Sequence, residues 1–122
     1  MQTFRFRDFQ VYKDARAFRL KIVALLKEFP SSERYRLIDQ IHRSCLSIVL
    51  NIAEGSAKHS DADFARFLEM SIASVNETVA GFDVACDDNL IDKNRLQLLE
   101  QDAENLARQL GGFIKKLRSS EK

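Results

Sequence analysis

The sequence has few of the residues that end or bend regular secondary structure. Its 122 residues include one proline and four glycines, so few positions favour a tight turn. This scarcity argues against many short strands joined by turns and favours long helices. With 45% hydrophobic and 30% charged residues, the composition is that of a globular protein. We expect a single domain over residues 1–122.

Cysteine and histidine are also scarce, which argues against disulfide and metal frameworks. Cys45 and Cys86 have no metal-type spacing, and both lie among apolar residues, so we interpret them as small core residues in a reducing compartment. A di-iron site in a helical bundle needs two Glu-x-x-His pairs and further inward carboxylates. The sequence has only His42 and His59. We therefore predict no metal and no cofactor.

Catalytic motifs are missing as well. The sequence has no glycine-rich phosphate loop, no Gly-x-Ser-x-Gly and no Cys–His pair with an orienting group. Four serines lie in predicted helices without a base beside them: Ser44, Ser47, Ser71 and Ser74. Small residues at this spacing favour close helix packing. We predict no catalytic residue and no enzyme activity.

The chain also lacks membrane and export signals. No stretch approaches the ~18 uncharged apolar residues that a membrane span needs. Residues 1–5 have no apolar region of the kind found in signal peptides. We therefore expect a cytoplasmic protein that makes no membrane contact.

Hydrophobic residues at helical spacing are abundant. In four segments they recur at alternating intervals of three and four, which is the period of a packed helix seam. We predict helices at about 8–28, 32–57, 61–87 and 93–118. Short connections make neighbouring helices antiparallel, so the predicted fold is all-α, an antiparallel up-down-up-down four-helix bundle. The expected N-caps are Ser31 or Ser32, Ser60, and Asp92.

The second predicted helix is apolar over more than one face. Its seam is widened by Leu37, Leu46, Val49 and Leu50. A helix with so wide an apolar arc needs a second buried side. It is therefore either the central helix of the bundle or a contact with another subunit.

One face of this otherwise apolar helix carries a row of polar residues, which we call the polar stripe. Gln40, Arg43, Ser47, Asn51 and Glu54 follow one another at intervals of three or four and so share one face. One interpretation is a solvated face. The other is an ordered hydrogen-bond network or a contact with another chain.

Charge is unevenly distributed, although the net charge is only +1. Residues 1–29 carry seven Lys or Arg and three Asp or Glu, whereas residues 59–90 carry one and seven. Arg16, Arg19 and Lys27 form a candidate basic patch. Aromatic residues alternate with the cations of residues 1–29. One interpretation is RNA or DNA binding, in which the cations contact phosphates and the rings stack on bases. Docking of Phe9 and Tyr12 in the bundle is the other.

Several runs resemble a known bacterial family. They are Phe29-Pro30-Ser31-Ser32-Glu33-Arg34-Tyr35, Leu37, Gln40, Arg43, Ser47-Ile48, Asn51-Ile52-Ala53-Glu54-Gly55, and, on the third helix, Phe64, Phe67-Leu68, Ser74 and Glu77. Together they resemble the bacterial four-helix bundle proteins first noticed as reading frames in intervening sequences of 23S rRNA genes. The resemblance covers about residues 8–110.

The resemblance implies a homopentamer with no established enzyme activity. It extends to accessory subunits of retroelement reverse transcriptases, which look like basic nucleic-acid-binding rings. The positions that it singles out are Glu33, Arg34, Gln40, Arg43, Asn51, Glu54 and Gly55. This chain has Val49 where many relatives have proline, so a straighter second helix is expected. Ser71-Ile72-Ala73-Ser74 replaces the usual Ala-Arg-Gly-Ser, which removes an arginine.

These observations favour a non-enzymatic homo-oligomeric scaffold or adaptor of unknown cellular role. Its partners would be further copies of itself and an unidentified protein. The basic first helix and the acidic third helix would meet across a head-to-tail contact. The alternative is an RNA-binding accessory protein.

Overall fold

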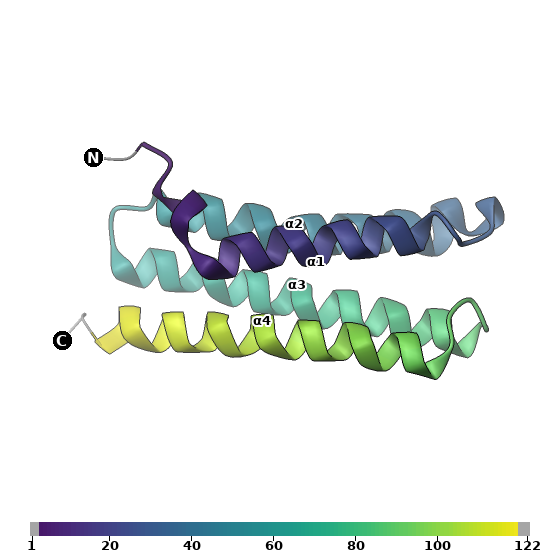
Figure 1. Ribbon diagram of the computed structural model, residues 1–122. Helices are drawn as coiled ribbons and strands as arrows, with labels where there is room; N and C mark the ends of the chain where they lie inside the picture. The colour runs from purple at the N-terminus through teal and green to yellow at the C-terminus, as the bar shows by residue number, and fades with distance from the viewer. Residues whose placement is uncertain (1–2, 120–122) are drawn as a thin grey trace.

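The computed structural model describes residues 3–119, and in that range it is a bundle of four α-helices. The chain runs up and down the bundle, so consecutive helices are antiparallel (Figure 1). Helices α1 (Gln10–Leu26) and α2 (Asp39–Ser56) form the upper layer in this view. Helices α3 (Asp61–Asp87) and α4 (Lys93–Ser119) lie below them. The predicted all-α four-helix bundle is confirmed.

Helix α1 is shorter than the predicted range 8–28. A separate 3-10 turn, η1 (Arg5–Asp8), precedes it, and Phe9 between the two has an extended backbone. The Phe9 ring packs on Phe113 of α4 at 5.3 Å between ring centroids, which anchors this break. At the other end, Phe29 N–H donates to the Leu26 carbonyl in a tighter i→i+3 turn. This tightening fits the restriction that Pro30 places on the residue before it.

The α-helical part of the second predicted helix, 32–57, begins later than expected. The chain first forms a 3-10 turn, η2 (Ser31–Glu33), and a π-helical turn, η3 (Arg34–Ile38). Neither Ser31 nor Ser32 acts as a side-chain cap. Instead, a long-range ion pair from Arg36 to Asp88 at the end of α3 holds this segment at 3.0 Å. From Asp39 onward α2 is continuous through Val49.

Helices α3 and α4 follow the predicted ranges closely and use the predicted caps. Asp63 N–H donates to Ser60 Oγ at 3.1 Å, and Arg95 N–H donates to Asp92 Oδ1 at 2.8 Å. Asn89 ends α3 with a φ of 62°, the left-handed conformation that asparagine tolerates. Gly111 and Gly112 lie within α4 without breaking it.

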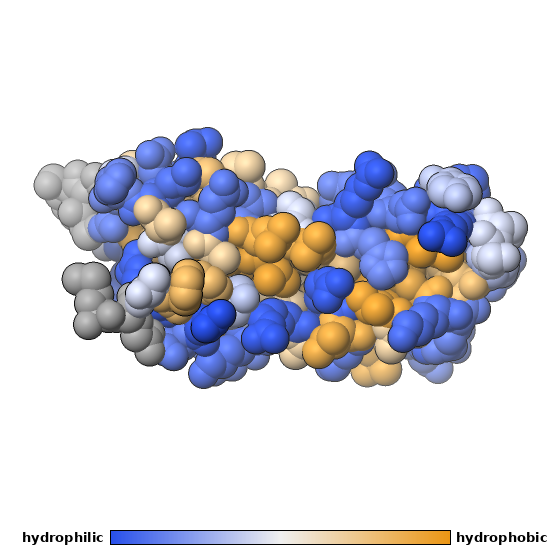
Figure 2. All heavy atoms as spheres, turned by 90° about the horizontal axis from the view of Figure 1, so that it is seen from above, coloured by the Kyte–Doolittle hydropathy of each residue, from blue (hydrophilic) through white to orange (hydrophobic). Residues whose placement is uncertain are grey.

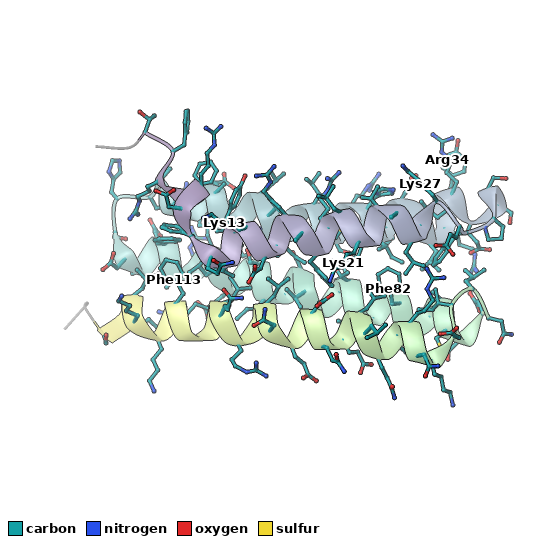
Figure 3. All side chains as sticks on the ribbon, viewed as in Figure 1. Lys13, Lys21, Lys27, Arg34, Phe82 and Phe113 are labelled. Carbon is teal, nitrogen blue, oxygen red and sulfur yellow. The ribbon has the colours of Figure 1, made fainter. Side chains whose placement is uncertain are left out.

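The helix seams meet in one core. The apolar residues that recur at intervals of three and four in and just after the first helix are buried, namely Val11, Ala15, Phe18, Ile22, Leu25 and Phe29. Ile41, Cys45, Ile48 and Ile52 of α2 are buried as well. Figure 3 shows Phe82 and Phe113 pointing inward from α3 and α4. Among the described helices, none is both long and apolar enough to cross a membrane.

Exposed ion pairs join α1 to α4. Lys21 Nζ lies 3.0 Å from Asp102, and the Arg95 guanidinium contacts both Glu28 oxygens at 2.8 Å. Hydrogen bonding by Arg95 lowers the pKa of Glu28 below its usual value. Lys21 therefore has an ion-pair partner within the bundle, whereas Arg16 and Arg19 of the same helix form no ion pair in the described range.

Two glycines allow α2 and α3 to approach closely. A Cβ atom on Gly55 would lie 2.8 Å from Phe67 Cβ, and one on Gly81 would lie 2.8 Å from Ile41 Cγ1. Phe67 Cβ is fixed to the α3 backbone, so the helix itself would have to move to relieve the first contact. The two helices thus meet at a distance that glycine permits and alanine does not.

We expect Gly55→Ala to destabilise the fold. The overpacking penalty of about 1–3 kcal/mol opposes a helix-propensity gain of up to about 1 kcal/mol, and the fixed position of Phe67 makes the penalty the larger. Gly112→Ala is the matched control, because apart from its chain neighbours and the nearby backbone of its own helix no atom of the described residues lies within 4 Å of its added Cβ. It should stabilise by about 0.5–1 kcal/mol. Urea unfolding at one fixed protein concentration measures both, and equal effects would contradict the packing role of Gly55.

Candidate interaction surface

The predicted polar stripe of α2 divides into an inner and an outer half. In the inner half, Asn51 is buried and its Nδ2 donates to both the carbonyl oxygen and the Oγ of Ser47 at 3.0 Å. The Ser74 hydroxyl of α3 donates to Ser47 Oγ at 2.8 Å. These side chains form the ordered network that was one of the two interpretations of the stripe.

The network continues along the α2–α3 seam. The Thr78 hydroxyl is fully buried and lies 2.8 Å from both Ser44 Oγ and the Ser74 carbonyl oxygen. Ser71, also fully buried, donates to the Ile48 carbonyl oxygen at 2.9 Å. The serines therefore satisfy one another where the helices are closest. Sequence reasoning expected small-residue packing here but missed Thr78, although it lies four residues after Ser74 on the same face.

The outer half of the stripe faces away from the bundle. Gln40 donates across to Glu77 of α3. Arg43 and Glu54 are exposed, and within residues 3–119 neither side chain forms a hydrogen bond or an ion pair. Arg43, Leu46, Leu50 and Glu54 follow one another at intervals of three, four and four, so they share one outward side of α2.

The candidate positions do not form one site. Glu33 pairs with Arg36 at 2.8 Å, and the Arg34 guanidinium lies 5.8 Å from the centre of the exposed Tyr35 ring. This cluster is at the end of the bundle where α1 turns into α2. Gly55 is about 30 Å away along the helix and is buried against α3. Gly55 therefore has a packing role and is not part of the exposed surface.

The predicted basic patch lies on the side of α1 that faces α2 and solvent. In the described range, Arg16, Arg19 and Lys27 form no ion pair. Arg16 lies over the Tyr12 ring at 5.8 Å. Arg19 is half-buried, and its Nε atom is buried without any hydrogen-bond acceptor. Figure 3 shows Lys21 between α1 and α4 and Lys27 at the outer edge of α1.

The aromatic residues next to this patch belong to the bundle. Phe9 stacks on Phe64 at 6.1 Å and Tyr12 packs against the core. This agrees with the docking interpretation. The rings are not arranged as an open stacking platform beside the cations.

Exposed leucines lie among these cations. Leu20 of α1 is 65% exposed, and Leu46 and Leu50 of α2 are 40% and 53% exposed. Figure 2 views the α1–α2 side of the bundle and shows hydrophobic residues gathered along its middle. We name this surface the apolar–basic face. Its residues are Arg16, Arg19, Leu20, Lys27, Leu46 and Leu50.

Comparison with known proteins identifies the family. The family model described as 23S rRNA-intervening sequence protein matches residues 7–112. The chain belongs to the 23S rRNA-intervening sequence protein family. A crystal structure of a protein of unknown function from the S23 ribosomal protein family of Bacteroides thetaiotaomicron is similar, with a TM-score of 0.79 and 26% identity. The match covers 86% of this chain and 98% of that one. No curated protein matches the chain.

In this member of the 23S rRNA-intervening sequence protein family, the described residues hold no group of three or more metal-ligating side chains. Cys45 is buried and Cys86 is half-buried, and both are free thiols. Burial raises the pKa of Cys45, against a smaller opposing effect of the Arg19 charge. A raised pKa disfavours the reactive thiolate, which agrees with a packing role for Cys45.

We expect the two halves of the stripe to differ in stability measurements. Asn51→Ala removes two hydrogen bonds at a buried position and should lower the free energy of unfolding by about 1–2 kcal/mol. Arg43→Gln and Glu54→Gln change exposed, unpaired groups and should stay within about 0.5 kcal/mol. Urea titration followed by circular dichroism separates the two outcomes. A large loss for Glu54→Gln would show that the outer half also serves the fold.

Proposed function

We propose that this chain is a non-enzymatic, homo-oligomeric scaffold or adaptor that works in the cytoplasm as a pentamer. The observation that carries the proposal is the apolar–basic face, where three exposed leucines lie among cations without partners in the bundle. Single exposed leucines are ordinary on protein surfaces, but a contiguous apolar patch is typical of an interaction site. The number five rests on the family resemblance.

The leucines have no packing role left inside the monomer. The isoleucines of α2 fill the core and its small residues contact α3, so Leu46 and Leu50 remain outside. Burying them, with Leu20, against another subunit removes apolar area from water at roughly 25 cal/mol per Å². Such a subunit contact would bury the outer side of α2, in agreement with the expectation that a helix with so wide an apolar arc is buried on a second side. The remaining surfaces of the assembly are then available to an unidentified protein partner.

Replacing the three leucines together, Leu20→Ser, Leu46→Ser and Leu50→Ser, should give a folded monomer. Light scattering after size exclusion should find about 70 kDa for a pentamer of the unmodified 14.0 kDa chain and about 14 kDa for the variant. The helical circular dichroism spectrum should be unchanged, because the three side chains are exposed.

Leu98→Ser is the matched control, since Leu98 is 61% exposed but lies on α4. It should assemble as the unmodified chain does. A monomeric unmodified chain, or a triple variant that still assembles, would refute the proposed use of this face.

Binding of RNA or DNA as an accessory protein is the second candidate function. It is favoured by the unpaired cations Arg16, Arg19 and Lys27 on one side of α1, and by the resemblance to reverse-transcriptase accessory subunits. Phosphate contacts need such cations. The docked positions of Phe9 and Tyr12 argue against the stacking contacts that would accompany them.

The ratio of absorbance at 260 and 280 nm across the size-exclusion peak tests this candidate. For the scaffold we expect a nucleic-acid-free peak at both 50 mM and 200 mM salt. An RNA-binding protein that makes several phosphate contacts would lose retained RNA by orders of magnitude in affinity over this salt range. RNA carried at low salt and released by Arg16→Gln with Lys27→Gln would favour the second candidate.

A further inference from the structure

A groove with acidic walls runs between α3 and α4. Its floor is formed by small apolar side chains, which are Val75, Val79, Ala80, Ala103 and Ala107. Its walls carry the carboxylates of Asp83 on α3 and of Glu100 and Glu104 on α4. The groove encloses about 320 Å³, and no cation lines it. Beyond Glu100 a second hollow between the same two helices is lined by Lys93 and Asp87, which carry opposite charges.

The three carboxylates of this groove have no partner in their own chain. In the part of the chain that the structure describes, Asp83, Glu100 and Glu104 form no hydrogen bond and no ion pair. Some other acidic residues of the bundle are paired, such as Asp102 with Lys21 and Glu28 with Arg95. The bundle therefore has unpaired anions along one groove and unpaired cations on the apolar–basic face.

The outer side of α1 carries an apolar residue between two cations, Arg16, Leu20 and Lys27, and we call these three residues the ridge of α1. Arg16, Leu20 and Lys27 follow at intervals of four and seven, so they lie along one side of the helix. Leu20, at 65% exposure, is the apolar residue of this ridge. The two cations are separated by about 16 Å along the helix, whereas the residues that line the groove span about 12 Å of α3 and about 10 Å of α4. The long side chains of Arg16 and Lys27 would therefore have to reach inward from either side of Leu20 to meet the carboxylates. This is the helix-in-groove mode of recognition.

We propose that the ridge of α1 docks into the acidic groove between α3 and α4 of a second copy of the chain. Leu20 packs on the alanine floor, and Arg16 and Lys27 reach Asp83, Glu100 and Glu104. The proposal rests on the proposed self-assembly and specifies which surfaces meet.

The contact is heterologous, because a ridge on one side of the bundle meets a groove on another side. The helix α1 contacts α2 and α4, so its outer ridge points away from the α3–α4 groove of the same chain (Figure 1). Repetition of such a contact gives a ring or a filament rather than a two-fold dimer. A closed ring of five copies satisfies every ridge and every groove.

A charge swap tests the pairing. Arg16→Glu with Lys27→Glu places like charges in the contact and should weaken assembly at least about tenfold. Glu100→Arg with Glu104→Arg should do the same from the groove side. The chain that carries all four changes has a negative ridge and a positive groove, and it should assemble again.

Lys115→Glu with Lys116→Glu is the control, since it changes the net charge by the same amount at exposed positions of α4 outside the groove. It should assemble normally. Light scattering gives the mass of each species, and circular dichroism verifies that each double variant is folded.

The outcomes separate the two proposals. If the unmodified chain assembles but the variant with all four charge changes does not, the ridge-in-groove pairing is wrong and the scaffold proposal stands. Double variants that assemble as well as the unmodified chain would likewise overturn the pairing. A monomeric unmodified chain overturns both proposals.

Discussion

The close packing of α2 on α3 is the constraint on which the rest of the structure depends. Gly55 and Gly81 let the two backbones approach. The hydroxyls of Ser44 and Thr78, and those of Ser47 and Ser74, then form hydrogen bonds across the seam. The isoleucines of α2 face the core and its small residues face α3. Leu46 and Leu50 lie on the remaining side of the helix and are therefore exposed in the monomer. The exposed apolar surface is thus a consequence of how tightly the opposite side of the helix packs.

The same logic applies to charge. Lys21 of α1 pairs with Asp102 of α4, and Glu28, just after α1, pairs with Arg95 of α4. The other cations of α1 point toward α2 and solvent, where α2 offers leucines rather than carboxylates. Three acids without an ion-pair partner, Asp83, Glu100 and Glu104, lie together in the α3–α4 groove. A monomer with a net charge of only +1 therefore presents two surfaces of opposite sign that it cannot bring together by itself.

Hydrophobic period and cap chemistry were sufficient to predict most of the fold. The seams, Ser60, Asn89 and Asp92 act locally, so their positions could be inferred from neighbours in sequence. The segment before α2 could not, because its π-helical turn is held by Arg36 reaching Asp88, 52 residues away. The polar stripe shows the same limit. Intervals of three and four place Ser47 and Glu54 on one face, but which of them meets α3 depends on how α2 is rotated against its neighbour.

The two candidate functions compete for the same side chains. If Arg16 and Lys27 enter a groove lined by carboxylates, their charges are neutralised and closed off from phosphate. An assembled ring would then have to bind nucleic acid through other cations, such as the exposed Arg43 on the outer side of α2. If instead the cations of α1 face RNA, the carboxylates of Asp83, Glu100 and Glu104 stay unpaired, and the exposed Leu20 between the cations gains nothing from phosphate contact. The presence of that leucine on the ridge favours a protein surface as its partner, and the chain itself carries a surface of the required shape and sign.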